Sequence, residues 1–304
     1  MKRQKSKEKR IRRRVGDSTG GAGRKKRLGQ TALWIILIAI FFITGGVYLL
    51  SENLEVTFYH LYSAKMTGSA NVRMVVLSDM HNREFGPGNE ELVKQIQTLQ
   101  PDIILVAGDM VNSDEENLDI ILNLCSQLVE IAPVYYSPGN HEDYLMYEKE
   151  VPLEQLLMDK GVHVLVNRAE TVTIHNTIFS IGGLTTSVEG YEEYGAEFLE
   201  DYENSGGFKL LISHYPSLYY EKLADKEIDL GVCGHYHGGQ IRLPLIGGLY
   251  HGDTGFFPKY NGGMYHLPHS TVFVSRGMGG HSRLPRVNNR PELAVIDING
   301  RPEK

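Results

Sequence analysis

Short apolar runs alternate with amphipathic segments over much of the chain. The run at 72–77 (VRMVVL) is rich in β-branched residues, as buried strands are. A segment follows at 89–100, in which Leu92, Ile96 and Leu99 recur at the spacing of one helix face. This order predicts a strand and then an amphipathic helix.

The same two patterns recur further along the chain. Helical spacing of apolar residues predicts helices at 117–131 and around 153–160. Strands alternate with helices early and dominate late, so we expect an α/β sandwich whose functional residues lie in loops at strand ends. The further strands are expected within 102–110, 134–142, 162–166, 171–182, 208–214, 228–237, 271–279 and 292–298.

An uncharged segment of 20 residues, 31–50, stands apart from these patterns. At about 1.5 Å per residue, a helix of that length spans roughly the 30 Å hydrocarbon core of a bilayer. Trp34 and Tyr48, near its ends, are residue types typical of the membrane interface. A cleaved signal peptide has a shorter apolar region, of about 7–15 residues, and the upstream pair Arg12-Arg13 lacks the flanking pattern of a twin-arginine signal. The segment predicts an uncleaved transmembrane helix.

Charge is divided unevenly around that segment. Residues 1–30 contain 13 of the 31 Lys and Arg residues and two acids, a net charge of +11, whereas the remaining 274 residues carry 18 basic and 35 acidic side chains, a net of −17. Basic residues beside a span stay in the cytoplasm, which places 51–304 outside. A nucleic-acid-binding arm is the other interpretation of the basic block. Membrane topology needs no further partner, and the acidic remainder argues against binding a nucleic acid.

Four parts follow from these observations. In the third part, residues 51–70, Leu54, Val56 and Phe58 alternate with polar residues, which predicts an edge strand. The fourth part, residues 71–304, is long enough to bury one large core. The parts are a basic cytoplasmic tail at 1–30, a single-pass transmembrane helix at 31–50, a connector at 51–70 and an extracytoplasmic domain at 71–304.

Acidic and histidine side chains follow five of the predicted strands. Taken singly, an aspartate or histidine after a strand is most often a cap or turn residue. Residues two apart in extended chain point the same way, so Asp79 with His81, and His235 with His237, each direct two donors toward one region. Five such strand ends together indicate a metal site. They are Asp79-Met80-His81, Gly108-Asp109, Gly139-Asn140-His141-Glu142, Ser213-His214 and Gly234-His235-Tyr236-His237.

These motifs, D-x-H, G-D, G-N-H-E, S-H and G-H-x-H in that order, resemble those of the calcineurin-like metallophosphoesterases. The resemblance covers 72–298. The run GGQIRLP after the last histidine pair, and SRGMG before the final strand, are most similar to the membrane-anchored bacterial YkuE/YaeI-like branch. The resemblance implies a fold of two packed mixed β-sheets flanked by helices, with a dinuclear metal centre.

The resemblance also implies a role for each motif residue. His141 is expected to contact the substrate phosphate and to protonate the leaving oxygen, and Asp109 to bridge two metal ions. The first ion is expected to be bound by Asp79, His81 and His237, and the second by Asn140, His214 and His235.

Elementary chemistry agrees with two divalent ions. An anionic phosphorus centre repels hydroxide, and two ions about 3.5–4 Å apart overcome this by generating bound hydroxide near neutral pH and by holding the attacking and leaving oxygens in line. Imidazoles, carboxylates and one amide are better ligands for Mn²⁺, Fe or Zn²⁺ than for Ca²⁺. We therefore expect a hydrolase of phosphate mono- or diesters that acts by attack of metal-bound hydroxide.

Three interpretations of the function stay open. A membrane tether favours a lipid- or envelope-linked phosphate ester. Part of the branch is similar to enzymes that cleave the pyrophosphate of UDP-2,3-diacylglucosamine, but those face the cytoplasm, against the topology expected here. A membrane-anchored module that binds phosphate ligands without turnover is the third alternative, and degenerate motifs, which this sequence lacks, would be its mark.

Other candidate sites are weaker. Ser78 and Ser213 flank motif residues, but neither lies in a G-x-S-x-G elbow. Cys125 and Cys233 are expected to be free buried thiols. Among residues outside the motifs, His281 and Arg283 are the first candidates for substrate contact. Tyrosines and glutamates at 189–220 form either a solvated face or a cap over the metals.

Overall fold

The structure is a computed structural model of the chain. It divides into two compact units, Met1–Leu50 and Ser51–Lys304. Most of the segment 31–50, where a transmembrane helix is expected, lies outside the described residues, as do His281 and Arg283. No helix within the described ranges combines the length and the apolar character that a membrane span requires. The structure describes residues 33–35, 38, 53–66, 71–115, 117–185, 187–280 and 285–300.

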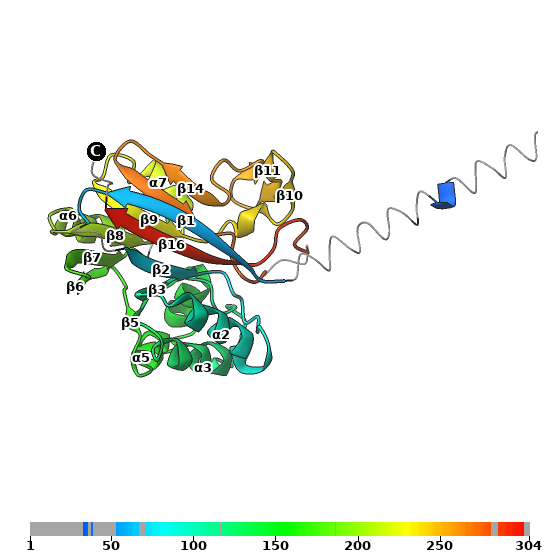
Figure 1. Cartoon of the computed structure of the whole chain (residues 1–304), viewed down its shortest axis with the longest axis horizontal. Coiled ribbons are helices and arrows are strands. Elements are labelled where there is room, and N and C mark those ends of the chain that lie inside the picture. Colours follow the sequence, from blue (N-terminus) through cyan, green and yellow to red (C-terminus); the bar gives the residue numbers. More distant parts are fainter. Residues whose placement is uncertain are drawn as a thin grey trace, which may run out of the picture. The chain divides into compact units, whose positions relative to one another are not determined.

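The first sheet of the larger unit has six strands (Figure 1). In spatial order they are β1 (Glu55–Ser63), β16 (Glu292–Gly300), β2 (Val72–Leu77), β3 (Ile103–Ala107), β4 (Val134–Ser137) and β5 (His163–Val164). Strands β2 to β5 are parallel, whereas β16 is antiparallel to β2 and parallel to β1. The starts of β1 and β16 therefore lie at the edge where β2, β3 and β4 end. The predicted edge strand in the connector is confirmed as β1.

The second sheet also has six strands. In spatial order they are β14 (Gly263–His266), β15 (Ser270–Val274), β9 (Ile228–Cys233), β8 (Phe208–Ile212), β7 (Thr177–Gly183) and β6 (Arg168–Ile174). The four central strands are parallel, and β14 and β6 are antiparallel partners at the two edges. Both sheets are thus mixed, as expected.

Each sheet packs against a core on both of its faces. Because side chains alternate along a strand, one strand contributes to two cores. In β2, Met74 and Val76 belong to the core between the two sheets, whereas Val75 and Leu77 belong to the core shared with helices α2, α3 and α5. Helices α6 and α7 cover the outer face of the second sheet. The helices are α2 (Glu90–Leu99), α3 (Asp119–Leu128), α4 (Asn140–Asp143), α5 (Leu153–Met158), α6 (Ala196–Glu203) and α7 (Pro216–Glu221), with short turns at Pro87–Asn89, Tyr144–Glu148, Tyr191–Gly195 and His237–Gly239.

One predicted strand is two strands in the structure. The apolar run expected at 171–182 divides into β6 and β7, which pair as an antiparallel hairpin. His175 and Asn176 form the turn, with φ of 46° and 65°. Asparagine tolerates this left-handed backbone better than most residues, and it ends the run. The single-strand prediction was therefore wrong at this point.

Two small hairpins between β9 and β14 were not predicted. They pair β10 (Arg242–Leu243) with β11 (Gly247–Gly248), and β12 (Tyr250–His251) with β13 (Gly255–Phe256). Each strand has only two residues, too few for an alternating pattern to be recognised against the surrounding glycines and prolines. Their tertiary contacts matter for the site described below.

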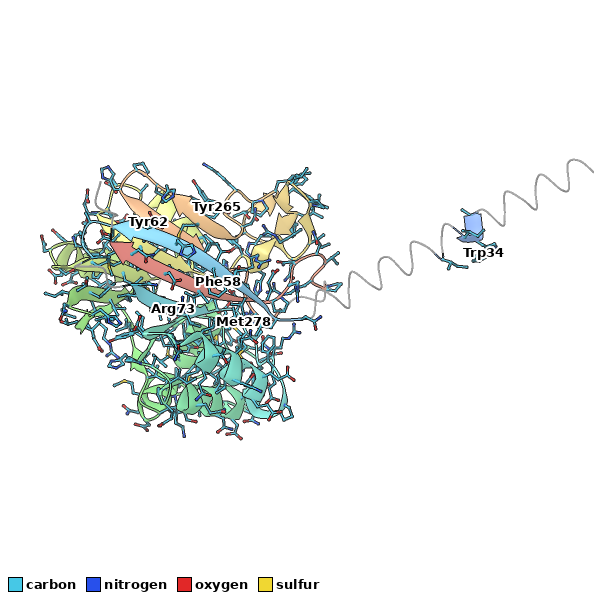
Figure 2. The ribbon with its side chains drawn as sticks, viewed as in Figure 1. Trp34, Phe58, Tyr62, Arg73, Tyr265 and Met278 are labelled. Carbon is cyan, nitrogen blue, oxygen red and sulfur yellow. The ribbon has the colours of Figure 1, made fainter. Side chains whose placement is uncertain are left out.

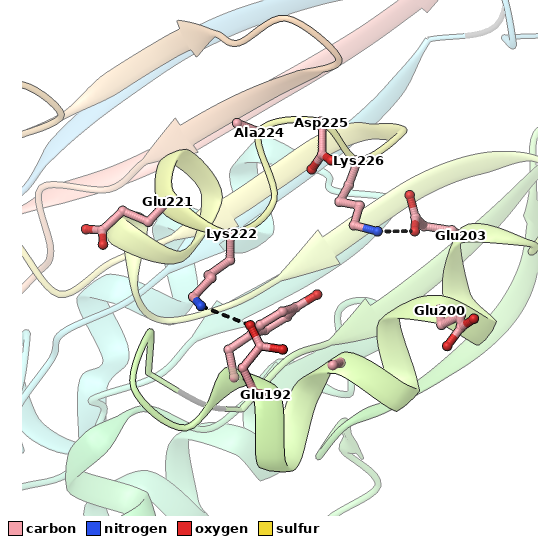
Figure 3. Close-up of a pocket in the computed structure, with 10 residues that line it drawn as sticks. Glu192, Glu200, Glu203, Glu221, Lys222, Ala224, Asp225 and Lys226 are labelled. Atoms are coloured by element: carbon pink, nitrogen blue, oxygen red, sulfur yellow. Dashed lines mark hydrogen bonds and ion pairs between the residues drawn. The ribbon is translucent and has the colours of Figure 1, made fainter.

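The tyrosine- and glutamate-rich segment 189–220 serves mainly as packing and as a solvated face. Tyr191 and Tyr202 are buried in the core on the outer face of the second sheet. Glu192 and Glu203 line an open cleft of about 760 Å³ (Figure 3), where each pairs with a lysine, at 3.0 Å and 2.8 Å. These contacts fit a solvated face at 191–203, whereas Tyr215 of the same segment lies beside the motif histidines, with its ring centroid 4.8 Å from that of His235.

Both cysteines are buried free thiols, as expected. Burial raises the pKa of the Cys125 thiol to about 12 and that of the Cys233 thiol well above its ordinary value. Cys233 donates to the Phe273 carbonyl oxygen at 3.3 Å. Neither thiol has the thiolate character of a nucleophile.

Candidate metal centre

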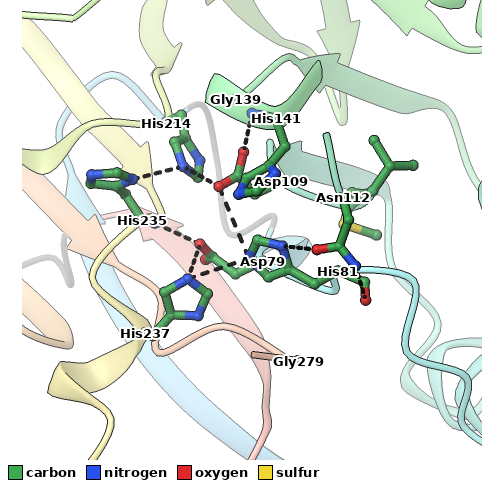
Figure 4. Close-up of polar contacts among 12 residues, drawn as sticks. Asp79, His81, Asp109, Asn112, Gly139, His141, His214, His235, His237 and Gly279 are labelled. Carbon is green, nitrogen blue, oxygen red and sulfur yellow. Dashed lines mark hydrogen bonds and ion pairs between the residues drawn. The ribbon is translucent and has the colours of Figure 1, made fainter. Parts of the chain in front are cut away.

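The carboxyl ends of five parallel strands, three in the first sheet and two in the second, meet at one edge of the sandwich. Parallel strands end at a common edge, and the packing of the sheets brings the two edges together. Figure 4 shows side chains from both sheets pointing toward one another there. The motif residues are Asp79 and His81 after β2, Asp109 after β3, Asn140 and His141 after β4, His214 after β8, and His235 and His237 after β9.

Asp79, His81 and His237 form one group of converging donors. One ligand atom from each lies within 4.8 Å of the others. The Nε2 atom of His237 is 3.3 Å from Nε2 of His81 and 3.6 Å from Oδ1 of Asp79. Nδ1 of His81 faces Oδ1 of Asn112 at 3.0 Å. Because that oxygen only accepts, the contact assigns the ring hydrogen to Nδ1 and leaves Nε2 with a lone pair toward the group.

Asp109, His214 and His235 form a second group within the same distance limit. Nε2 of His214 is 3.0 Å from Oδ2 of Asp109 and 3.1 Å from Nδ1 of His235. Nδ1 of His214 donates to the Ala107 carbonyl oxygen at 2.8 Å. Oδ2 of Asp109 also lies 4.0 Å from Nε2 of His81. This carboxylate therefore stands between the two groups.

Asn140 and His141 begin the short helix α4. Oδ1 of Asn140 is buried and accepts no hydrogen bond from the described residues. The His141 backbone N–H donates to Oδ1 of Asp109 at 3.0 Å, which leaves Oδ2 of Asp109 facing the cluster. Nδ1 of His141 accepts from the Ser113 backbone N–H at 2.8 Å. This hydrogen bond assigns the ring hydrogen of His141 to Nε2.

Glu142, the last residue of the G-N-H-E motif, fixes the loop that carries Asp109. Its Oε2 accepts from the backbone N–H groups of Asp109 and Gly139, at 2.8 Å and 2.9 Å. Its Oε1 accepts from the Met110 N–H and the Tyr136 hydroxyl, both at 2.7 Å. Glu142 is fully buried, so these bonds, with a longer one of 3.3 Å from the Val111 N–H to Oε1, replace the water that its carboxylate loses. The loops after β3 and β4 are thereby held as one unit.

Several cluster residues adopt a backbone conformation that is unusual for side chains with a Cβ atom. A left-handed φ in a residue other than glycine costs of order 1–3 kcal/mol and persists only where neighbours hold it. Here the chain turns sharply at the end of each strand, which directs two side chains from one loop toward the cluster. The φ values are 50° at Asp79, 51° at His81, 54° at Asp109, 70° at His235 and 47° at His237.

The protonation of the metal-free cluster follows from burial and from opposite charges. Burial alone would raise the pKa of the Asp109 carboxyl, but His214 holds that pKa well below its usual range. Burial alone would lower the pKa of His214, and the Asp109 carboxylate raises it to about 10. Burial, together with the charge of Asp109, raises the pKa of Asp79. Burial, with His81 close by, lowers the pKa of His237 well below its ordinary value.

His251 and Asp253, on the hairpin of β12 and β13, extend the cluster outward. Oδ2 of Asp253 is 2.6 Å from Nε2 of His235, and the His251 ring centroid is 5.0 Å from that of His235. Burial and the neighbouring His235 lower the pKa of His251 to about 4. Sequence reasoning missed both residues. The only available signal was an H-x-D spacing at 251–253 that follows no apolar run.

The residues present fit a pair of divalent cations. Two buried carboxylates repel each other, two imidazole nitrogens face each other at 3.3 Å, and one buried amide oxygen has no hydrogen bond within the described residues. A cation in each group would relieve all three features. The donors are four imidazoles, two carboxylates and one amide, a set that suits Mn²⁺, Fe or Zn²⁺.

An α/β sandwich with two adjacent groups of histidines and carboxylates at its strand ends defines a class of protein, the metal-dependent hydrolases. Residues 72–239, more than half of the chain, match the family model described as calcineurin-like phosphoesterase. The chain belongs to this family. It is therefore a metallophosphoesterase, an enzyme that hydrolyses phosphoric esters, and the family typically binds two divalent metal ions.

Curated relatives agree with this family. Phosphodiesterase YaeI of Escherichia coli (strain K12) is 28% identical over 239 residues, which cover 76% of this chain and 83% of that protein. Uncharacterized metallophosphoesterase YkuE of Bacillus subtilis (strain 168) is 27% identical over 259 residues, covering 83% and 87%. Transmembrane protein with metallophosphoesterase domain, from Danio rerio, is 27% identical over 284 residues, covering 88% and 62%. The resemblance based on the five motifs is confirmed.

Proposed function

We propose that the chain is a membrane-anchored, dinuclear phosphoesterase that hydrolyses phosphate mono- or diesters. The observation that carries the proposal is the pair of donor groups that share the Asp109 carboxylate, whose Oδ2 lies 3.0 Å from His214 and 4.0 Å from His81. When bound, two divalent ions activate water and withdraw negative charge from the phosphate. We assign the first ion to Asp79, His81 and His237, the second to Asn140, His214 and His235, and the bridge to Asp109.

We assign His141 to the substrate phosphate. Its Nε2–H is the donor, since Nδ1 accepts from the Ser113 backbone N–H. His141 would then orient the phosphate and stabilise its charge by a hydrogen bond. The second role that we assign to His141 is protonation of the leaving oxygen.

The relative named phosphodiesterase favours a diester as substrate. Acidic surface residues argue against a large polyanion, because the chain after residue 30 carries a net charge of −17. A small or lipid-linked phosphate ester does not meet that repulsion over a broad surface. We therefore propose a lipid- or envelope-linked ester.

The proposed anchor is the uncharged segment 31–50, with the basic residues 1–30 in the cytoplasm and the enzyme domain outside. The relative from Danio rerio, named a transmembrane protein, supports membrane attachment. We expect the full chain to stay in the membrane pellet after an alkaline carbonate wash, and protease added outside the cell to digest the domain. Release into the wash, or protection of the domain until the membrane is opened, would contradict this topology.

The test of the centre is the variant Asp109→Ala in the full chain, kept in detergent micelles. We expect the wild type to bind about two transition-metal ions per chain and to hydrolyse bis(p-nitrophenyl) phosphate with Mn²⁺. Loss of the bridging carboxylate should lower kcat/KM roughly 10³-fold or more, equivalent to about 4 kcal/mol in the barrier.

Asp159→Ala, which removes an exposed aspartate that follows α5, is the matched control and should keep both metal and activity. The proposed centre is rejected if the wild type binds no transition metal in elemental analysis. Full activity of Asp109→Ala would reject it as well.

A further inference from the structure

Five large apolar side chains are exposed on the two small hairpins between β9 and β14. Exposed apolar side chains scattered singly need no explanation, but such a concentration marks an interaction surface. The hairpins are joined by backbone hydrogen bonds from Leu249 to Ile241 and from Phe257 to Leu249, at 2.7 Å and 2.9 Å. We call this set the hairpin patch. It comprises Leu245 (108% exposed), Ile246 (62%), Tyr250 (42%), Phe256 (71%) and Phe257 (55%).

The hairpin patch adjoins the metal centre. The hairpin that carries Tyr250 and Phe256 also carries Asp253, whose Oδ2 is 2.6 Å from the His235 ring. The rings of Tyr250 and Phe256 lie 5.2 Å apart, at the base of this hairpin. A molecule whose phosphate reaches the centre can therefore rest its apolar part on the patch.

The start of β1 lies beside the same hairpins. The Asn53 carbonyl oxygen accepts from Nε of Arg290 at 3.3 Å, and two residues earlier Asn288 donates to the Arg242 carbonyl oxygen at 3.0 Å, in the first hairpin. Figure 2 shows Met278 near the start of β1, at the site edge, and Tyr62 toward its other end. The chain thus enters the domain at the edge that holds both the metal centre and the patch.

The reach of the connecting chain limits how far this edge can be from an anchor. Leu50 ends the uncharged segment three residues before Asn53, a stretch that can extend at most about 11 Å. If residues 31–50 span a membrane, the edge that holds the patch stays close to the bilayer. Lys259, exposed in a cleft of about 420 Å³ that Leu245 and Ile246 also line, adds a cation that attracts anionic headgroups.

We infer that the hairpin patch docks on the bilayer that holds the anchor, and that the centre takes the phosphate ester of a lipid in that bilayer. Aromatic and aliphatic side chains at loop tips partition into the interfacial region of a membrane. The choice of substrate rests on the proposed function. The docking itself does not, so the two can be tested separately.

Docking is tested by the depth of a fluorescent label in the full chain, reconstituted in nanodiscs of phosphatidylcholine and phosphatidylglycerol with brominated acyl chains. Ile246→Cys carries the label, and Ile178→Cys is its control. Ile178 is also an exposed isoleucine (50%), and it lies at the start of β7, at the edge away from the centre. The native thiols do not compete, because both are buried.

We expect bromine to quench the label at 246 at least about twofold and to leave the label at 178 nearly unchanged. Equal quenching at the two positions would overturn the docking inference. A pyrene label at 246 that forms excimers without being quenched would also overturn it, because two copies of the chain would then cover the patch.

The substrate is tested with the double variant Leu245→Ser/Ile246→Ser and with Ile178→Ser as control. We expect hydrolysis of phosphatidylglycerol in the nanodisc to fall about tenfold in the double variant only, with hydrolysis of soluble bis(p-nitrophenyl) phosphate unchanged. The inference is overturned if the enzyme hydrolyses the soluble ester but not phosphatidylglycerol. It is also overturned if the substitutions leave hydrolysis of phosphatidylglycerol unchanged. A wild type that hydrolyses neither ester would reject the proposed function, while quenching would still decide the docking.

Discussion

Three histidines of the cluster are each oriented by a neighbour behind the ring, whereas Nδ1 of His237 has no hydrogen bond within the described residues. Asn112 sets the ring hydrogen of His81, the Ala107 carbonyl oxygen accepts from His214, and Asp253 faces the outer nitrogen of His235. Such partners fix the tautomer and orientation of a ligand and raise its basicity. Asp253 differs from the other two because it comes from a hairpin that also meets solvent, with 63% of its side chain exposed.

Removal of Asp253 should therefore weaken the second metal site and leave the first largely intact. In Asp253→Ala, Nε2 of His235 loses its 2.6 Å partner, and the ring can rotate or carry its hydrogen on Nδ1. We expect the affinity for one of two Mn²⁺ ions to fall about tenfold. Isothermal titration of the metal-free protein measures this without reference to activity.

Asp253→Asn is the conservative comparison and should keep part of the affinity, because its amide oxygen still accepts a hydrogen bond. Asp225→Ala, at an exposed aspartate outside the cluster, should have no effect. Two unchanged binding constants in Asp253→Ala would show that His235 is held without this carboxylate.

At the residue scale, the motif residues could be predicted because they directly follow buried strands in the sequence. Asp79 and His81 are two residues apart, and the strand before them is fully apolar at its end. Asn112 and Asp253 could not be predicted, because only tertiary contacts bring them to His81 and His235. The orientation of the His141 ring depends on the Ser113 amide, which no pattern in the sequence indicates.

At the scale of elements, the loop after β3 leaves almost no space beside the loop after β4. Gly108 has a φ of 74°, and a Cβ atom there would lie 2.5 Å from the Gly139 amide nitrogen. Gly108→Ala should therefore lower the free energy of unfolding by roughly 2–4 kcal/mol, from backbone strain and overpacking. It should also reduce metal binding, since Asp109 follows directly. Urea unfolding and elemental analysis measure the two effects.

Gly206→Ala is the matched control, since a Cβ atom at Gly206 meets no atom within 4 Å. We expect a change of less than about 0.5 kcal/mol there, as is usual for a surface substitution. Equal stability of the two variants would mean that the loops after β3 and β4 can separate without cost.

Most elements could be predicted, because their apolar residues follow one clear period. The helix at Glu90–Leu99 and the strands that end at Leu77 and Ala107 are of this kind. The hairpin at His175 was missed because β-type sequence continues on both sides of its two-residue turn. The small hairpins at 242–256 were missed because each strand has only two residues. In the first hairpin, the tip at 244–246 is also apolar where a loop is usually polar, and it carries Leu245 and Ile246 of the hairpin patch.

At the scale of the whole molecule, the cluster joins the two sheets. Asp79 and Asp109 come from the first sheet, and His214, His235 and His237 come from the second. Metal ions that bind only the folded chain stabilise it by mass action. We expect removal of metal by a chelator to lower Tm by at least about 5 °C, and re-addition of Mn²⁺ to restore it.

This gain in Tm should be larger at pH 8 than at pH 6. In the metal-free protein, the pKa of His214 is raised to about 10, so His214 is protonated at both pH values and must lose a proton to bind metal. Protons compete with metal more strongly at pH 6. Asp109→Ala should show little gain at either pH, and a Tm unaffected by metal in the wild type would contradict a shared centre.

The position of β16 also bears on how the chain is made. This strand, at Glu292–Gly300, lies between β1 and β2 and pairs with both. Until the ribosome has passed residue 300, β1 therefore lacks its partner in the sheet, and β2 is paired only with β3. A domain built in this way cannot close its first sheet during synthesis. If the domain is exported during synthesis, it would thus cross the translocation channel unfolded. Completion of the first sheet on the far side of the membrane would then oppose its return.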